Sequence, residues 1–275
     1  MNYSLSTFTA PNDVRLDQYV GELNAAWQRI QTISWPNLNR ITNGRVHRTW
    51  ENPNLGTPNH SGSEHYLSTY TIPSASYVVE AEVWNIGVFS EWRSDGPLIP
   101  PGTPNTVHPN GTITRTSEGF QRANSNVIIG GRASIGQFNG YRVQYDQLNA
   151  LWSLQKVVNH STISINRTFF DIIPFGQSRL VQLVLRGYWV EMWIDGINRQ
   201  FFRDEGVGAF STAGFTMLRF DSGPDNWSLN EFSIRGLHLD NFRVHDEFPP
   251  LPITEEMMLF GTGNSSGQVL LSWTE

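Results

Sequence analysis

The sequence predicts an all-β protein, an antiparallel sandwich of two packed sheets. Apolar and polar residues alternate in many short runs, and a period of two is typical of a strand that buries one face. Asn-Gly and Asp-Gly pairs, at 43–44 and 195–196, stand between such runs and predict tight hairpins. The 275 residues include 24 Gly and 15 Pro, which suits many turns. A sandwich of this length is commonly one domain.

The clearest alternation lies in the segment 180–202. Asp195-Gly196 predicts a type I′ turn, because that turn needs a positive φ at both central residues. The two runs before this turn, which are separated at Arg186-Gly187, each place their apolar residues on one face of a strand. These residues are Val181, Leu183 and Leu185 in the first run, and Val190, Met192 and Ile194 in the second.

The segment 13–30 fits two patterns. Leu16, Val20, Leu23 and Trp27 recur at helical spacing, and Asp13 could cap such a helix. The alternative is a turn that leads into a strand at 26–30. Gly21 interrupts the helical pattern, which costs about 1 kcal/mol. We therefore expect the strand, preceded by a short first strand at 6–9.

Further along the chain, strands and irregular segments alternate. Residues 76–87 predict a strand with Tyr77, Val79, Ala81 and Val83 on its apolar face, and five more short runs follow between 126 and 173. Residues 51–65 and 93–118 lack a periodic apolar pattern and predict loops. The second is long enough to suggest a binding loop at the rim of the sandwich or an interface arm.

Several motifs add a family resemblance to this pattern. W-I-D-G-I at 193–197, T-A-G-F at 212–215 and G-L-H-L-D-N-F-R-V at 236–244 occur in the order and at the spacing of a concanavalin A/laminin-G-like jelly-roll domain. The resemblance covers residues from about 43 to 246, and the first forty loosely. It implies an antiparallel two-sheet jelly-roll sandwich and supports the strand at 26–30.

Composition argues against two classes of partner. The net charge is −6, and Lys156 is the only lysine among 19 basic residues, so the chain has no basic stripe for nucleic acid. No run of 18 apolar residues occurs, so we expect no membrane span. Cysteine is absent, which excludes disulfides and thiolate metal sites without choosing a compartment.

The best candidate site is a face of the strand 189–194 that carries Trp189, Glu191 and Trp193. Aromatic rings stack on sugar faces and a carboxylate accepts hydroxyl hydrogen bonds, so these residues, with Trp84, suggest a glycan platform. The alternative is that the large rings fill the second face of the sandwich or a subunit interface. Glu80 and Glu82 more simply form the solvated side of their strand.

Catalytic and metal motifs are weak. The paired carboxylates of retaining glucanases, in the strand pattern E-x-D-x-x-E, are absent from the sequence, so we expect no enzyme. The seven histidines show no zinc spacing. The family resemblance implies that Asp240 could hold a structural calcium ion, and no other cofactor is expected. The simpler alternative is that Asp240 caps a loop backbone or pairs with an arginine.

The composition changes after residue 246. We expect a sandwich domain at 1–246 and, at 247–275, a Pro-rich linker and an extended C-terminal arm that ends in a strand. A lone strand is not stable alone, so it must pair with this domain, with another copy or with another protein. The residues expected to carry assembly through this arm are Phe260, Val269, Leu270, Leu271 and Trp273.

Two functions follow from these features. The first is a non-enzymatic virion protein, a bacteriophage capsid decoration or tail-associated subunit, which docks on capsid, tail or identical subunits through its arm and also touches cell-surface glycans. Its location would be the virion surface. The alternative is an extracellular carbohydrate-binding module, and a glycoside hydrolase is a distant third.

Overall fold

The chain is described here from a computed structural model. The structure describes residues 1–11, 14–33, 39–48, 62–86, 105–107, 113–115, 125–134, 139–147, 149–159, 162–174, 176–205, 208–222, 237–250, 262–263 and 269–270. The fold is all-β, and every strand pair in these residues is antiparallel.

One sheet has nine strands and contains both the first strand and the last strand of the sandwich. Its order is β16 (Ile197–Arg203), β15 (Trp189–Ile194), β14 (Ser178–Arg186), β7 (Tyr77–Asn85), β18 (Leu237–His245), β5 (Arg45–Arg48), β4 (Asn39–Thr42) and β2 (Val14–Arg15), and β1 (Asn2–Ser6) pairs with β18.

The second sheet has seven strands. Its order is β13 (Thr162–Phe170), β12 (Leu151–Val158), β11 (Gly140–Asp146), β10 (Ser125–Ala133), β17 (Phe215–Ser222), β6 (Gly62–Thr71) and β3 (Trp27–Ile33). Two small pairs lie outside the sandwich, β8 (Asn105–Val107) with β9 (Ile113–Arg115), and β19 (Thr262–Gly263) with β20 (Val269–Leu270).

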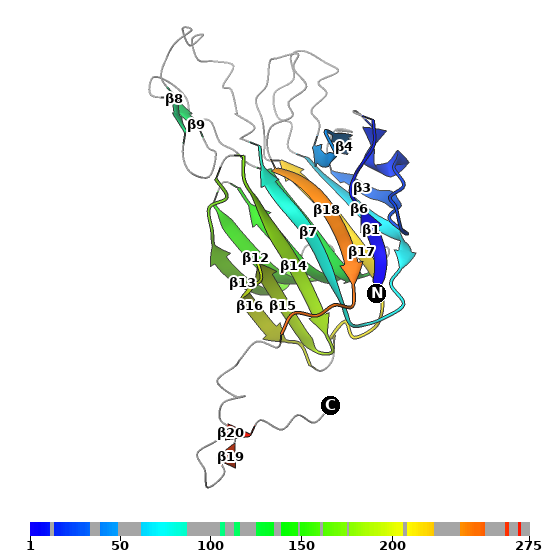
Figure 1. Cartoon of the computed structure of the whole chain (residues 1–275), viewed down its shortest axis with the longest axis vertical. Coiled ribbons are helices and arrows are strands. Elements are labelled where there is room, and N and C mark those ends of the chain that lie inside the picture. The colour runs from blue at the N-terminus through cyan, green and yellow to red at the C-terminus, as the bar shows by residue number, and fades with distance from the viewer. Residues whose placement is uncertain are drawn as a thin grey trace.

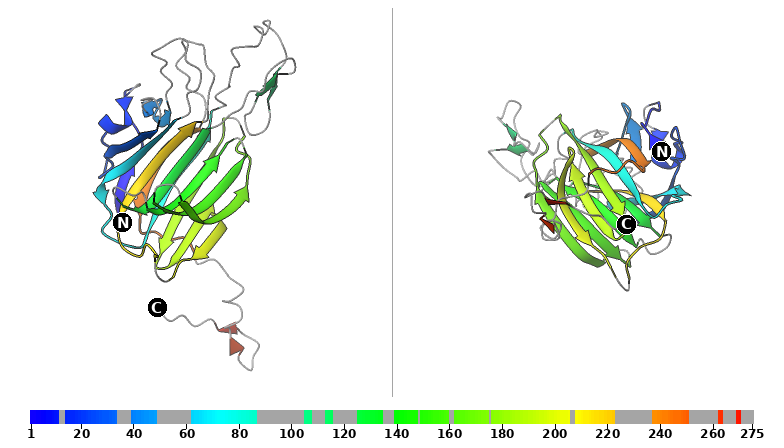
Figure 2. Two further views of the ribbon diagram at one scale, coloured as in Figure 1. Left: turned by 180° about the vertical axis from the view of Figure 1, so that it is seen from behind. Right: turned by 60° about the horizontal axis from the view of Figure 1, so that its bottom comes forward.

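The two sheets pack face to face, as Figure 1 shows from the side of the nine-stranded sheet and Figure 2 from behind. The apolar faces predicted from the alternation point inward. Val79 and Ala81 of β7 and Leu183 of β14 are fully buried in one core, together with Trp152 and Leu154 of β12 from the other sheet. Burial of such side chains is the main favourable contribution to folding, at about 25 cal/mol per Å² of apolar surface.

The predicted turns are present. Asp195 and Gly196 have φ values of 51° and 74°, and they join β15 to β16. Asn43 and Gly44, with φ values of 52° and 72°, join β4 to β5 in the same way. Positive φ at both central residues is the requirement that the Asx-Gly pairs satisfy.

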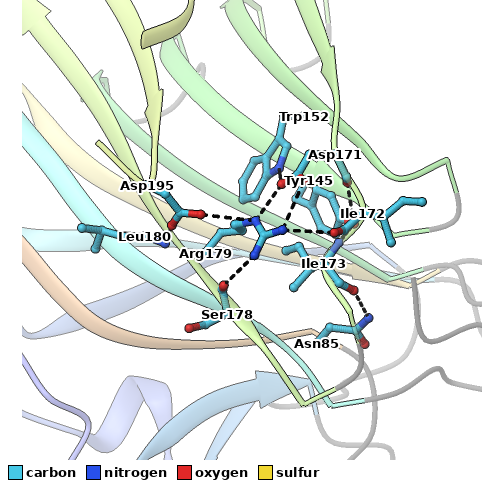
Figure 3. Close-up of polar contacts among 10 residues, drawn as sticks. All are labelled: Asn85, Tyr145, Trp152, Asp171, Ile172, Ile173, Ser178, Arg179, Leu180 and Asp195. Carbon is cyan, nitrogen blue, oxygen red and sulfur yellow. Dashed lines mark hydrogen bonds and ion pairs between the residues drawn. The ribbon is translucent and has the colours of Figure 1, made fainter. Parts of the chain in front are cut away.

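The crossover from the seven-stranded to the nine-stranded sheet, residues 171–177, is held by Arg179 (Figure 3). The Arg179 guanidinium lies 2.9 Å from the Asp171 carboxylate and 3.3 Å from that of Asp195, and it donates to the Ile172 carbonyl at 3.2 Å. These carboxylates raise the pKa of Arg179, chiefly through the Asp171 hydrogen bond. The end of β13 is thereby joined to the β15–β16 turn.

Arg132 performs a similar function at the opposite end of the sandwich. Its Nε donates to the Ala75 carbonyl, and its Nη1 and Nη2 donate to the carbonyls of Phe210 and Gly187, each at 2.8 Å. A planar guanidinium can reach three acceptors in this way. One side chain therefore joins three connecting segments that are far apart in sequence.

The segment 13–30 follows the strand interpretation. In residues 14–30, which the structure describes, the only helix is the three-residue 3₁₀ turn η1 (Leu16–Gln18), and β3 begins at Trp27 within the expected strand. The first strand, β1, ends at Ser6, earlier than the predicted 6–9, and the chain turns at Phe8, whose φ is 50°.

Two loop predictions need correction. Residues 62–65, expected in a loop, begin β6 and pair with both β3 and β17. The segment 93–118 contains the short pair β8–β9, and its other residues lie outside the described part. Neither segment has the alternating apolar pattern by which strands were identified.

The C-terminal arm is described only in part. Val269 and Leu270 form β20, which pairs with β19 of the same arm, whereas Phe260, Leu271 and Trp273 lie outside the described residues. Pairing of the arm with another subunit therefore stays a prediction, as does the domain boundary at 246.

Candidate functional site

The predicted glycan residues of β15 lie on the outer face of the nine-stranded sheet, but two of them are closed to solvent. Glu191 is fully buried and Trp193 is 7% exposed. Trp193 Nε1 donates to Glu191 Oε2 at 2.7 Å, and Asn198 Nδ2 donates to the same oxygen at 3.3 Å. Burial raises the pKa of Glu191 despite these donors. Glu191 Oε1 is buried and has no hydrogen-bond partner in the described part of the chain.

The other two predicted residues are partly accessible but lie apart. The Trp189 ring packs against Phe201, with ring centroids 5.7 Å apart. Trp84, two strands away on β7, lies under the Arg45 guanidinium, 3.8 Å from its ring centroid. Strand β14 lies between the strands that carry these tryptophans. On β14, Ser178 pairs with Trp84 and Gln182 pairs with Trp193. Four residues of strand, roughly 13 Å, separate these two positions, so the tryptophans do not form one continuous platform.

Glu80, between these tryptophans, takes part in an ion-pair network. Its carboxylate lies 3.2 Å from Arg243 Nε and 3.7 Å from His245 Nε2, and Gln182 Nε2 donates to it at 2.6 Å. Burial alone would raise the pKa of Glu80, but these three partners outweigh burial and lower it. The expectation that Glu80 is simply solvated is therefore wrong, because a neighbouring strand on each side supplies a partner.

The structure places Asp240 in the simpler of its two predicted roles, in which it caps a loop backbone or pairs with an arginine. Asp240 Oδ1 accepts a hydrogen bond from the Asn241 N–H at 2.7 Å, and Arg45 Nε lies 3.9 Å from Oδ2. Burial, with a smaller effect from Glu82, raises the pKa of Asp240. Calcium needs six to eight oxygen ligands, and no group of three or more metal-binding side chains occurs in the described residues. The residues described do not fit a calcium site, and the ion is not confirmed.

A site that the sequence analysis missed lies on the outer face of the seven-stranded sheet. There, adjacent strands place polar side chains opposite one another in two cross-strand rows, which we call the polar ladder. Its rows are Arg142, Gln155 and Asn166, and Gln144, Ser153 and Thr168, contributed by β11, β12 and β13 in that order.

The polar ladder is internally hydrogen-bonded. Arg142 Nε donates to Gln155 Oε1 at 2.6 Å, and Gln155 Nε2 donates to Asn166 Oδ1 at 3.4 Å. Arg142 and Gln155 are buried, whereas Asn166 is exposed on the edge strand β13. Hydrogen bonds therefore hold the first row of the ladder in place, and the ladder becomes more accessible toward β13.

The other half of this face is apolar. Ile128, Met217 and Leu67, from β10, β17 and β6, form a buried cluster beside the ladder. Gly130 lies between the two halves, paired with Arg142 on one side and Met217 on the other. A Cβ at Gly130 would lie 2.7 Å from Met217 Cε, so glycine lets the Met217 side chain lie across this strand. One sheet face thus places hydrogen-bonding groups beside an apolar cluster, whose partly buried members are Ile30 and Phe215.

The ladder had a signal in the sequence. Residues 142, 144, 153, 155, 166 and 168 are polar at alternate positions, and they stand between core residues such as Val143 and Leu154. Each strand alone looks like an ordinary solvated face. Only the register of the three strands brings the six side chains together.

Comparisons with known proteins give the fold. No protein-family model matches the sequence, and no curated protein matches it. Among solved structures, LamAcat from Zobellia galactanivorans is 7% identical, with a TM-score of 0.51 over 89% of this chain and 97% of that one.

Two other similar structures have lower TM-scores. A galectin-like-fold protein from Bacillus subtilis is 9% identical, with a TM-score of 0.49 over 88% of this chain and 98% of that one. The carbohydrate-binding module CBM66 from Bacillus subtilis is 11% identical, with a TM-score of 0.43 over 80% of this chain and 94% of that one. Within the described residues, no helix is long and apolar enough to cross a membrane. The chain is a two-sheet antiparallel sandwich with the concanavalin A-like jelly-roll fold.

Proposed function

We propose that this protein is a non-catalytic carbohydrate-binding module that binds a glycan on the outer face of the seven-stranded sheet. The observation that carries the proposal is the accessible part of the polar ladder, Gln144, Asn166 and Thr168, beside an apolar cluster whose partly buried members are Ile30 and Phe215. A sugar ring has hydroxyl groups at its edge and C–H groups on its faces. Accessible amide and hydroxyl side chains can bind the hydroxyls, while partly exposed apolar side chains cover the faces.

The nine-stranded sheet offers less to a sugar. Glu191 and Trp193 are buried there, and Arg45 covers the Trp84 ring. A stacking platform needs an open ring face, which Trp189 supplies only in part because Phe201 packs against it. The predicted glycan role of these four residues stays untested, and we place the site on the opposite sheet.

The non-catalytic assignment is also part of the proposal. The sequence lacks the E-x-D-x-x-E strand, and Asp146, at the end of β11, accepts a hydrogen bond from Asn149 Nδ2 at 2.6 Å. Glycoside hydrolysis needs two carboxyl groups that flank the bond. A virion role rests on pairing of the arm, which stays a prediction. The polar ladder supports a binding module, so we propose the extracellular alternative in preference to virion decoration.

Binding to a panel of immobilised polysaccharides tests this function. We expect the protein to retain at least one polysaccharide, and a Gln144→Ala/Asn166→Ala variant to bind it about tenfold more weakly, since two lost hydrogen bonds cost about 1.4 kcal/mol or more. Neither side chain is part of the core, so circular dichroism should show an intact fold.

Trp189→Ala is the matched control on the opposite sheet, and its affinity should stay within about twofold. Loss of binding in Trp189→Ala alone would place the site on the nine-stranded sheet and overturn our assignment. Release of reducing sugar from the bound polysaccharide would contradict the non-catalytic part. No binding to any polysaccharide would contradict the function itself.

A further inference from the structure

The segment Asp246–Pro250 leaves β18 and lies on the nine-stranded sheet (Figure 1). Arg243 Nη1 lies 3.3 Å from Glu247 Oε2, and the Glu247 N–H donates to His245 Nδ1 at 3.2 Å. Arg186 Nη2 donates to the Pro249 carbonyl at 2.6 Å. The segment is therefore held against the sheet as far as Pro249, beyond the last strand of the sandwich.

Beside its end lies a group of partly exposed aromatic residues, which we call the aromatic strip: Trp189, Phe201 and Phe248, with Tyr188 next to Trp189 in the chain. Phe201 and Phe248 are 36% and 37% exposed, and Tyr188 is 50% exposed. Arg186, the cross-strand neighbour of Trp189, connects Phe248 to the rest of the strip, because its guanidinium lies 5.0 Å from the Phe248 ring centroid. Single exposed aromatics are ordinary, but a group of this kind suggests an interaction surface.

The aromatic strip is accompanied by cationic groups. The Arg203 guanidinium lies 5.7 Å from the Trp189 ring centroid, and Arg203 also forms an exposed ion pair with Glu205. Aromatic residues and arginine are the residues that most often dominate the energetics of protein interfaces. The strip therefore fits a peptide that brings apolar side chains and acidic groups.

The chain itself supplies such a peptide directly after Pro250. Residues 251–260 read LPITEEMMLF, with six apolar side chains, and with Glu255 and Glu256 in the middle. They lie outside the described residues. Because they start at the strip, tethering gives them an effective concentration there of the order of millimolar. A separate partner is not tethered and therefore lacks this effective concentration.

We propose that residues 251–260 dock on the aromatic strip of the same chain. Met257–Phe260 would cover the exposed rings, and Glu255 and Glu256 would face Arg186 and Arg203. The docked segment would fix where the remainder of the arm leaves the sandwich.

The absence of cysteine makes a direct test possible. In a Phe201→Cys/Met258→Cys variant, the two introduced thiols are the only ones, and docking should let them form an intramolecular disulfide under mild oxidation. The matched control is Ile163→Cys/Met258→Cys, because Ile163 is also an exposed apolar residue, 43% exposed, but lies on the edge strand β13. We expect the first pair to cross-link at least about tenfold faster than the control.

Mass spectrometry and non-reducing electrophoresis separate the outcomes. Equal rates for the two pairs would mean that the segment does not dock, and disulfide-linked dimers as the main product would mean that it docks on another copy. Either result overturns the proposal. A second measurement is a charge swap: Arg203→Glu should slow cross-linking severalfold and Glu256→Arg should restore it, while no effect of Arg203→Glu would remove the assigned ionic contact.

Discussion

Glu191 shows how the surroundings of one residue decide its chemistry. It lies on the polar side of an alternating strand, yet Trp193 and Asn198 cover it and no described group partners its Oε1. Because folding raises its pKa, the folded protein binds this proton more tightly than the unfolded chain does. The group therefore favours the native state at low pH and destabilises it as pH rises through the folded pKa.

Replacing Glu191 with Gln should raise stability at neutral pH. Gln keeps an acceptor for Trp193 and removes the buried charge, so we expect a gain of about 1 kcal/mol, or roughly 2–4 °C in Tm. The difference from the native protein should shrink as pH falls, which thermal melting across a pH series can follow. Glu205→Gln, at an exposed position, is the control. A gain independent of pH would contradict the explanation.

Arg132 is a polar side chain whose loss should strongly affect the folded state. Lys in its place could reach only one of the three carbonyls of Ala75, Phe210 and Gly187. We expect Arg132→Lys to lower the free energy of unfolding by about 2–4 kcal/mol, because carbonyls in three connecting segments lose a charged donor. Urea denaturation measures this, with Arg167→Lys, at an exposed position of the edge strand β13, as the control. If the two substitutions lowered the free energy of unfolding equally, the three contacts of Arg132 would not be the cause of its effect.

At the scale of elements, the tight turns connect sequence to structure most directly. At Gly196 a Cβ would meet nothing within 4 Å, so the demand for glycine comes from its φ of 74° alone. Gly196→Ala should therefore cost about 1 kcal/mol by thermal melting. Gly196→Asn should cost less, because asparagine tolerates this conformation. If both substitutions lowered the free energy of unfolding by the same amount, the positive φ would not explain the need for glycine.

Strands and their inward faces could be predicted because alternation is a local property. Val79 and Val190 lie in the core as expected. The outer faces could not be predicted in this way, because their environment depends on strands far apart in sequence. Glu80 meets Arg243 from β18 and Gln182 from β14, and Arg142 meets Gln155 and, through it, Asn166. A single strand carries no information about these partners.

For the whole molecule, one core extends from the first strands to the last. The Trp27 ring contacts that of Phe242, with centroids 5.0 Å apart, so residues early and late in the chain are buried together. We expect a chain ending at Pro250 to unfold in one calorimetric transition, with van't Hoff and calorimetric enthalpies that agree. Two separate transitions would show that residues 1–48 form an independent unit.

The pairing of β1 with β18 has a consequence for chain connectivity. Asn2 lies opposite His245, and the Asp246 N–H donates to the Met1 carbonyl at 3.2 Å, so both ends of the sandwich lie side by side. A few glycines could bridge them, and new ends could be opened at the exposed Asp195-Gly196 turn. Such a circular permutant should keep both sheets, since the strand order in space does not require the present starting point.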